Sequence, residues 1–326
     1  MPAKKLCRIL LWFPLAIALL WVIGLFIYQP LSLIPAGILL PLALLLRRRR
    51  IPADAWLLLL VLVEIPLYLA LPGPRHATWK SSWAKAPQCT IQGDILHIDH
   101  IRDFHYRSEH DFDIRYRSES YPLSQLESVD FAECHWDGMT AVCHTMLSFG
   151  FKDGRQLVVS AETRLPEGVE QNAIGGIYKQ YGMLYLFGTE EDIFALRTNH
   201  RHEDLSLYPM RIKPESARRL LLHYVELARR TEEEQIPYNT ITGNCSTGLV
   251  SGFRLLAPQM PRIYDLLPIH NGSIAGLLFR AGAFVTLPGE TEQELRTRCY
   301  LGYDLAKDAP AQYSRAIRLK NRSRRP

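Results

Sequence analysis

A cysteine at the start of a predicted helix gives the strongest signal for chemistry in this sequence. Asn244 is a good helix-capping residue, and the apolar stretch 245–256 that follows it has the composition of a helix. Cys245 would then hold the first helical position, where unpaired amides and the helix dipole lower the pKa of a thiol. The same amides could donate to an oxyanion as a thioester forms, with Asn244 and Ser246 in positioning roles. The alternative interpretation is a buried, inert cysteine that follows a helix cap.

His144 is the best candidate for a base that activates this thiol. It lies in the apolar stretch 141–149, which is predicted to be a strand, and a histidine in such a strand needs a partner or a function. Other histidines, such as His97 and His110, lie in charged surroundings that are typical of a surface. The alternative for His144 is a core histidine whose ring is bonded to a backbone carbonyl.

A third group would have to orient the imidazole. The Asp153-Gly154 pair predicts a hairpin that folds the next strand back beside that of His144. A two-residue loop would bring Thr163 opposite His144, whereas a one-residue bulge would bring Glu162 there. Glu162 is the better partner chemically, and Thr163 is the fallback. Arg164 could instead neutralise Glu162 in a structural ion pair.

The sequence gives no sign of a metal site. No pair of cysteines or histidines has zinc-type spacing on one face, and the run His200-Arg201-His202 is too short and too exposed in character. We therefore expect neither a metal nor a cofactor, so that the chemistry would depend on side chains alone.

The distribution of charge argues against a nucleic-acid partner. Residues 1–72 hold seven basic and two acidic side chains, which equals the net charge of +5 of the whole chain. The remaining 31 basic and 31 acidic residues cancel. Binding to nucleic acid needs a basic face on the folded domain, and only the stretch from Arg315 to Arg325 is locally basic. Such a tail is more typical of a solvated end than of a site for lipid headgroups.

Three apolar runs at the beginning of the chain, 9–28, 31–46 and 55–71, predict a membrane anchor. Basic residues precede the first run, and Arg47–Arg50 separate the second from the third. Both clusters are cytoplasmic if the first two runs form a hairpin, and the third run would then export the domain that follows. A cleavable signal peptide is disfavoured, because the first run lacks an Ala-x-Ala end and leads into more apolar sequence.

After the anchor at 1–72, the sequence has the pattern of an α+β protein. Residues 73–88 indicate a linker, 89–290 a domain with an antiparallel sheet and a cysteine-bearing helix, and 291–326 a C-terminal extension with a basic tail. Pro214 suits the first turn of a helix over 214–232. Alternating or apolar stretches predict strands at 90–98, 112–117, 126–132, 141–150, 156–162, 181–187, 193–198 and 277–286.

The number of cysteines leaves the disulfide pattern open. An odd count in an oxidising compartment leaves at least one thiol unpaired, and the sequence does not indicate which cysteines would pair. The domain holds Cys89, Cys134, Cys143, Cys245 and Cys299.

Several short motifs lie within about residues 76–255. The most specific is the block 238–247, which reads Tyr-Asn-Thr-Ile-Thr-Gly-Asn-Cys-Ser-Thr. The others are Ile101–Arg107, His144–Phe151, Ser160–Arg164 and Leu196-Arg197. Together these motifs resemble the Lnb N-terminal periplasmic domain family of bacterial envelope proteins.

The best-understood members of that family are lipoprotein N-acyltransferases that use a cysteine and a histidine, and the resemblance assigns those roles to Cys245 and His144. The order of a histidine and then Asn-Cys is also similar to that of circularly permuted papain-like acyltransferases, which implies a papain-like domain. In those family members the membrane segments follow the domain, whereas here they precede it. The domain chemistry is therefore implied, but the acyl acceptor is not.

The resemblance also implies roles for residues around this pair. Tyr238 and Asn239, in the most specific motif, are candidates for positioning or for oxyanion binding. Arg164 and Arg197 are candidates for support of the site.

The favoured hypothesis is a Cys–His acyltransferase or hydrolase anchored in the bacterial inner membrane, with its domain in the periplasm. It would form a thioester with an acyl group of a phospholipid or lipoprotein at the lipid bilayer. One alternative is a cysteine peptidase or amidase that acts on envelope peptides or peptidoglycan. Another is a non-enzymatic envelope module in which Cys245 forms a disulfide and His144 belongs to the core.

Overall fold

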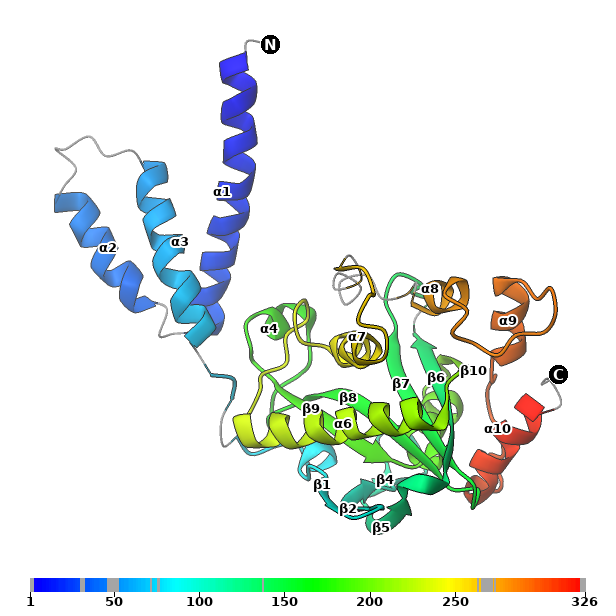
Figure 1. The fold of residues 1–326 in the computed structure, drawn as a ribbon. Helices are drawn as coiled ribbons and strands as arrows, with labels where there is room; N and C mark the ends of the chain where they lie inside the picture. The colour runs from blue at the N-terminus through cyan, green and yellow to red at the C-terminus, as the bar shows by residue number, and fades with distance from the viewer. Residues whose placement is uncertain are drawn as a thin grey trace.

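The structure is a computed structural model that describes residues 3–29, 33–45, 53–70, 72–74, 77–136, 138–262, 264, 272 and 274–322. Its polar domain is built on an eight-stranded sheet in the order β1-β2-β9-β8-β7-β6-β10, with β5 paired to β2 (Figure 1). Neighbouring strands are antiparallel, except that β2 and β9 meet in one parallel pair at Arg102 and Gly188. The predicted mixed fold with an antiparallel sheet is confirmed.

The strands of this sheet are β1 (Gln88–Gln92), β2 (Ile95–Arg102), β5 (Tyr116–Pro122), β6 (Leu126–His135), β7 (His144–Phe151), β8 (Gln156–Arg164), β9 (Gly182–Gly188) and β10 (Asp204–Pro209). A separate two-stranded ribbon pairs β3 (His105–Tyr106) with β4 (Phe112–Asp113).

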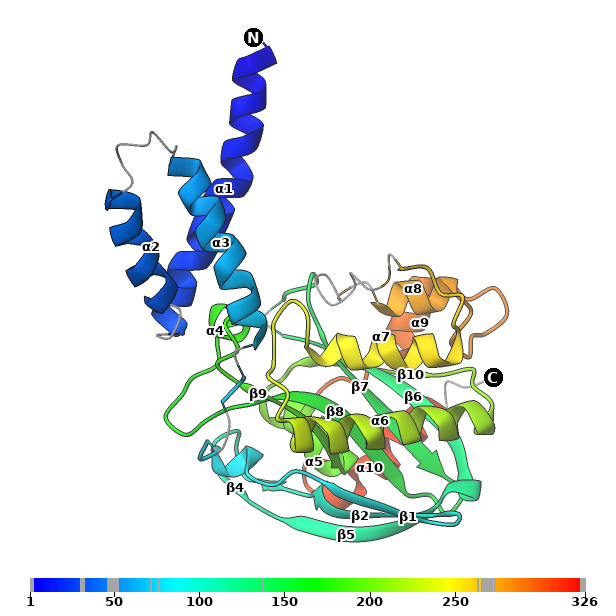
Figure 2. The same cartoon turned by 60° about the vertical axis from the view of Figure 1, so that its left-hand side comes forward.

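Helices cover both faces of the sheet (Figure 2). The helices α6 (Pro214–Glu234) and α7 (Cys245–Leu256) lie on one face, where Leu249 and Phe149 share one core. The helices α5 (Glu190–Ala195) and α10 (Tyr313–Arg322) lie on the other, where Ile317 and Met146 share a second core. Because side chains alternate along a strand, β7 contributes to both cores.

Two predicted strands are wrong, because both stretches begin as helices. The stretch 193–198 lies in α5 and in the π-helical turn Leu196–His200. Thr189 caps α5 by accepting a hydrogen bond from the backbone N–H of Asp192 at 3.2 Å. The stretch 277–286 begins inside α8 (Ile274–Arg280). A short apolar run does not by itself distinguish a buried strand from a buried helix.

The described part of the C-terminal stretch, residues 291–322, packs into the domain. Tyr313 of α10 is fully buried, and Arg296 of α9 (Glu292–Cys299) donates to a carboxylate of β6 at 2.9 Å. Arg318, one of the basic residues of the predicted tail, turns inward and bonds to Asp130 and Glu190. Basic side chains of this stretch therefore stabilise the fold, and residues 323–326 lie outside the described ranges.

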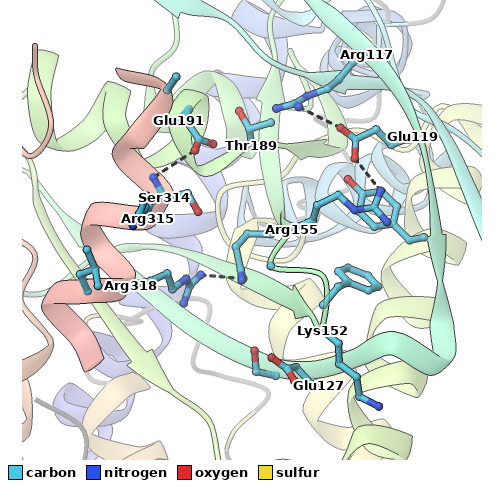
Figure 3. Close-up of a pocket in the computed structure, with 17 residues that line it drawn as sticks. Arg117, Glu119, Glu127, Lys152, Arg155, Thr189, Glu191, Ser314, Arg315 and Arg318 are labelled. Carbon is cyan, nitrogen blue, oxygen red and sulfur yellow. Dashed lines mark hydrogen bonds and ion pairs between the residues drawn. The ribbon is translucent and has the colours of Figure 1, made fainter. Parts of the chain in front are cut away.

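A polar cavity of about 650 Å³ lies beside α10 (Figure 3). Its charged side chains bond largely to one another: Glu119 accepts from Arg117 and from Arg155, each at 3.1 Å. Glu191 accepts from the backbone N–H of Ser314 at 3.2 Å, which ties α10 to α5. We interpret these groups as part of the packing of α10 on the domain.

The three predicted apolar runs are helical, as α1 (Ala3–Tyr28), α2 (Leu33–Leu45) and α3 (Ala53–Ala70). In the part of the chain that the structure describes, no one helix has both the length and the hydropathy to cross a membrane. The helical segments Ala16–Tyr28 and Leu33–Leu39 have the required length and hydropathy only when taken together, and a bend of 120° separates them. The structure thus supports an apolar N-terminal region with one bent pair, and the three separate spans stay a prediction. The arginine cluster Arg47–Arg50 lies outside the described residues.

The apolar helices contact the domain through the loop after α4 (Ala173–Ile177). The ring of Tyr178 stacks on that of Tyr28 with centroids 5.1 Å apart, and its hydroxyl donates to the carbonyl of Trp21 at 3.1 Å. Gly24 allows this approach, because a Cβ atom there would lie 1.9 Å from the Tyr178 hydroxyl. In Figure 2, α7 begins on the side of the domain nearest to these helices and ends beside α8.

Candidate active site

Cys245 is the first residue of α7, as the sequence predicts. The side chain of Asn244 accepts a hydrogen bond from the backbone N–H of Ser246 at 3.0 Å. In return, the hydroxyl of Thr247 accepts from the backbone N–H of Asn244 at 3.1 Å, which completes a capping box. The cap fixes the direction of the helix start and therefore the position of the Cys245 sulfur.

His144 is the first residue of β7, and its ring connects the thiol to a carboxylate. The imidazole forms a hydrogen bond with Cys245. Its Nε2 atom lies 3.1 Å from Oε1 of Glu162 and 2.7 Å from the hydroxyl of Ser160. Because Nε2 is used on that side, Nδ1 is the ring nitrogen left to face the sulfur. The side chains of His144 and Glu162 are 16% and 13% exposed, so the set can be reached from solvent.

The register of the β7–β8 hairpin brings Glu162 to this place. The backbone N–H of Phe151 bonds to the carbonyl of Arg155 at 3.0 Å, which closes a three-residue loop that contains Gly154 at a φ of +90°. The extra residue shifts the register, so that Met146 pairs with Ser160 and position 144 falls opposite 162. Of the two alternatives from the sequence, Glu162 is therefore the partner, and Thr163 is not.

Ser160 is a member of the site that the sequence interpretation missed. Its hydroxyl donates to Oε1 of Glu162 at 2.6 Å, so it can only accept from Nε2–H of His144. Ser160 lies two residues before Glu162 on β8 and therefore on the same face of the strand. This spacing of two residues in the sequence could have indicated that Ser160 lies beside Glu162. The hydroxyl holds the carboxylate and the imidazole in one arrangement.

The contacts shift the pKa values of all three groups. Burial alone would raise the pKa of Cys245, but the hydrogen bond and charge of His144, with the backbone N–H of Thr145, lower it to about 7. Burial opposes a charged His144, yet the Glu162 carboxylate and the Cys245 sulfur raise the pKa of His144 to about 9. Burial also opposes the charge of Glu162, whose pKa is nevertheless held well below its usual range by His144 and Arg197. Near neutral pH the pair is therefore a thiolate beside an imidazolium.

Residues 113–270 of the chain match the family described as the Lnb N-terminal periplasmic domain. This segment belongs to that family. The match includes Cys245, His144 and Glu162, and it confirms the resemblance, although the motif Ile101–Arg107 lies outside it. No curated protein and no solved structure matches the chain. The match indicates that this segment is a periplasmic domain of an envelope protein.

The two candidate supporting arginines of the Lnb domain have different partners. Arg197 donates to Oε1 of Glu162 at 3.2 Å, so it contributes to the charge of the site. Arg164 instead donates to Glu232 of α6 at 2.7 Å and to the backbone carbonyl of Trp83 at 2.9 Å. The alternative in which Arg164 neutralises Glu162 is therefore wrong, and Arg164 joins the sheet to α6 and to the segment before β1.

Asn239 organises the loop that precedes Cys245. Its side-chain oxygen accepts from the backbone N–H groups of Ile241 at 3.0 Å and Thr242 at 2.9 Å. Its side-chain nitrogen donates to the carbonyl of Ile177 at 3.1 Å and to the hydroxyl of Tyr68 in α3 at 2.9 Å. The structure therefore shows a positioning contact for Asn239, and it connects the loop directly to the apolar helices.

Tyr238 lies beside the reactive groups of the Lnb domain. Burial raises the pKa of Tyr238 to about 12, and the nearby sulfur of Cys245 adds to that rise. A side-chain hydrogen bond joins it to Thr163, the residue after Glu162. A neutral phenol at this place is suited to donate a hydrogen bond to an oxygen of a substrate.

The helix cap reduces the number of backbone amides that are available to bind an oxyanion. The N–H of Ser246 is bonded to the side chain of Asn244, and the N–H of Thr247 to its carbonyl at 3.1 Å. These two amides stabilise the helix start rather than point at a reacting atom. The backbone N–H of Thr145 bonds to the Cys245 sulfur, so this amide lies close to the place where an oxyanion would form.

A second set of possible ligands lies on the neighbouring strand. One ligand atom each from Glu133, His135 and Cys143 lie within 4.8 Å of one another. The sequence interpretation missed this set, because Cys143 reaches β6 only through the pairing of β6 with β7. Arg296 donates to Glu133 at 2.9 Å, so a cation already neutralises this carboxylate. The same position therefore suits a metal ion poorly.

Proposed function

We propose that this protein is a membrane-anchored periplasmic thiol acyltransferase or hydrolase of the bacterial inner membrane. The observation that carries the proposal is the connected set of Cys245, His144 and Glu162, with the thiol at a helix start and its pKa lowered to about 7. A cysteine helix packed on an antiparallel sheet that holds the histidine also supports the papain-like arrangement expected from the sequence.

In the acylation step, the Cys245 thiolate attacks the carbonyl carbon of an acyl ester and a C–S bond forms. The carbonyl electrons move to its oxygen, which would accept hydrogen bonds from the Thr145 amide and the Tyr238 hydroxyl. When the oxygen reforms its double bond, the C–O bond of the ester breaks. The leaving alcohol takes the proton of the His144 imidazolium, which leaves a thioester and a neutral imidazole.

In the second step, the neutral His144 removes a proton from an amine or from water as that nucleophile attacks the thioester. The C–S bond breaks, the Cys245 thiolate returns, and His144 is again protonated. Glu162 stabilises the imidazolium at both ends of the cycle, while Ser160 keeps the ring in one orientation. An amine acceptor gives transfer of the acyl group, and water gives hydrolysis.

The apolar helices support a substrate that lies in a lipid bilayer. Large apolar side chains are exposed on them, including Leu20, Ile27, Ile38, Leu62 and Leu69. Such a concentration of exposed apolar surface is typical of a membrane or partner contact. Because Asn239 bonds to Tyr68 of α3, the loop before Cys245 is held next to that surface. An acyl group of a phospholipid or lipoprotein is the substrate that this arrangement fits best.

The proposal is tested by trapping the intermediate. The full chain in lipid nanodiscs is incubated with an acyl-ester donor, stopped with acid and digested for mass spectrometry. We expect an acyl adduct on Cys245 in the natural protein and none in Cys245→Ala. A peptidyl adduct from an envelope peptide would instead establish a cysteine peptidase or amidase. Equal turnover by natural protein and variant would remove the proposed function.

The non-enzymatic alternative makes a different prediction for the thiols. It requires Cys245 in a disulfide, whereas the enzymatic proposal requires its thiol to face His144. Counting the thiols of the unreduced protein checks this point. A stoichiometric disulfide at Cys245 would favour the interaction module.

A further inference from the structure

An apolar cavity of about 540 Å³ lies between α7 and α8, along the helix that bears Cys245. We call it the α7 pocket. Its volume falls within the range of pockets that hold small ligands, about 300–1,000 Å³. Most of its lining side chains are aliphatic or aromatic, among them Leu249, Val250, Phe253, Ile274, Leu277 and Leu278.

The pocket begins one helical turn from the thiol. Leu249 lines it and follows Cys245 by four residues, so the two side chains lie on the same face of α7. A chain of contacts also connects the opposite wall of the pocket to Cys245. Ile274 lines the pocket, and the N–H of the next residue, Ala275, bonds to Glu133 at 3.3 Å. That carboxylate contacts Cys143, whose carbonyl lies 3.9 Å from the Cys245 sulfur.

We propose that the α7 pocket binds the alkyl chain of the acyl donor. This inference rests on the proposed function and names the substrate feature that the site selects. The acyl carbonyl would lie at Cys245, and the chain would run along α7 toward α8. The lining residues from Leu249 to Ala257 extend over about 12 Å at 1.5 Å of rise per residue, so a chain of intermediate length would be enclosed.

The chemistry of the walls favours a hydrocarbon chain over a peptide or a headgroup. A peptide would bring backbone N–H and C=O groups that need partners, and an apolar wall leaves them without hydrogen bonds. An alkyl chain brings none, and each buried methylene contributes about 0.8 kcal/mol, which corresponds to roughly a fourfold gain in affinity. Arg211 and Gln259 also line the pocket and carry polar side chains, but most of the lining is apolar.

The first experiment measures how acylation of Cys245 depends on chain length. Acetyl, butyryl, hexanoyl and octanoyl p-nitrophenyl esters are compared with the full chain in nanodiscs, against empty nanodiscs. We expect kcat/KM to rise by up to about fourfold per added methylene. Ala257→Trp and Ala281→Trp each place an indole ring in the pocket, from two different walls, and the side chain that each replaces is only a methyl group. Both should flatten this rise and change the acetyl reaction by less than about twofold.

Leu255→Trp is the matched control, because Leu255 is on the same helix, is 37% exposed and lies outside the pocket lining. It should keep the chain-length dependence of the natural protein. If the two pocket variants also keep it, the inference is overturned.

A binding experiment separates this inference from the proposed function. Cys245→Ser, which cannot form a stable thioester, is titrated with a fluorescent fatty acid, and the dye is displaced by alkyl carboxylates of increasing length. Displacement that strengthens with length and is lost in Cys245→Ser/Ala281→Trp supports the pocket even if no ester is turned over. Turnover on Cys245 without any such binding would leave the enzyme in place and remove the pocket.

Discussion

Two sets of the same three residue types lie close together in this domain, with the Cys245 sulfur 3.9 Å from the carbonyl of Cys143, and the thiols of the two sets have opposite chemistry. In one set the pKa of the thiol is lowered by its histidine, and in the other burial raises the pKa of the thiol. The reactive set consists of Cys245, His144 and Glu162, and the second set of Cys143, His135 and Glu133.

The difference lies in what surrounds each cysteine. Cys245 begins a helix and shares a hydrogen bond with His144, whereas Cys143 is 2% exposed and lies before a strand. Burial, with the negative charge of Glu133, raises the pKa of Cys143 far above its usual range. Glu133 accepts from Arg296 and also lies 3.5 Å from His135, whose pKa it raises, so this carboxylate has a cation and a histidine as Glu162 does. Residue types alone therefore do not make a nucleophile; the helix start and the hydrogen bond with His144 lower the pKa of Cys245, whereas burial raises that of Cys143.

The largest expected effect comes from removing each thiol in turn. Cys245→Ser should lower kcat by on the order of 10³-fold or more, because a serine hydroxyl is not ionised by this histidine. Cys143→Ser should leave kcat within about twofold. Iodoacetamide at neutral pH, followed by peptide mapping, should modify Cys245 and leave Cys143 unmodified. Equal labelling of the two cysteines would contradict the contrast between the sets.

The carboxylates should differ in the same direction. Glu162→Gln removes the charge that keeps His144 protonated, so the pKa of His144 should fall and kcat should drop by about 10–10³-fold. Glu133→Gln should leave kcat nearly unchanged. It should instead reduce the free energy of unfolding by about 1–3 kcal/mol, because Arg296 loses a charged partner. Steady-state kinetics and denaturant titration of both variants separate the two roles.

The pH profile of kcat/KM sharpens the comparison further. The thiolate–imidazolium pair exists above the pKa of Cys245, about 7, and below that of His144, about 9. Activity should therefore rise as pH increases through 7 and fall as it increases through 9. In Glu162→Gln the range should narrow from both sides, because a less basic histidine also stabilises the thiolate less. A profile that rises only once, near the pKa of an ordinary thiol, would contradict the ion pair.

The sequence predicted the residues of the reactive set better than the contacts between them. The helix start at Cys245 could be predicted because an N-cap is a local signal. The choice between Glu162 and Thr163 depended on one loop residue, and a shift by one residue turns a strand's side chains to the other face. The second set, and the burial of the C-terminal helices, depend on contacts between distant segments. Only the folded chain shows Arg296 against Glu133 or Arg318 against Glu190.

The smallest expected effect comes from the contact that joins the loop before Cys245 to the apolar helices. Tyr68→Phe removes the hydroxyl that accepts from the side chain of Asn239. Asn239 keeps its bond to the carbonyl of Ile177. We therefore expect the free energy of unfolding to fall by about 1 kcal/mol and kcat/KM to decrease two- to tenfold. Tyr28→Phe is the matched control, because the ring that stacks on Tyr178 is retained. If the contact positions the loop before Cys245, Tyr68→Phe should slow acylation by esters and iodoacetamide labelling alike, and equal rates in both variants would show that the helices only tether the domain.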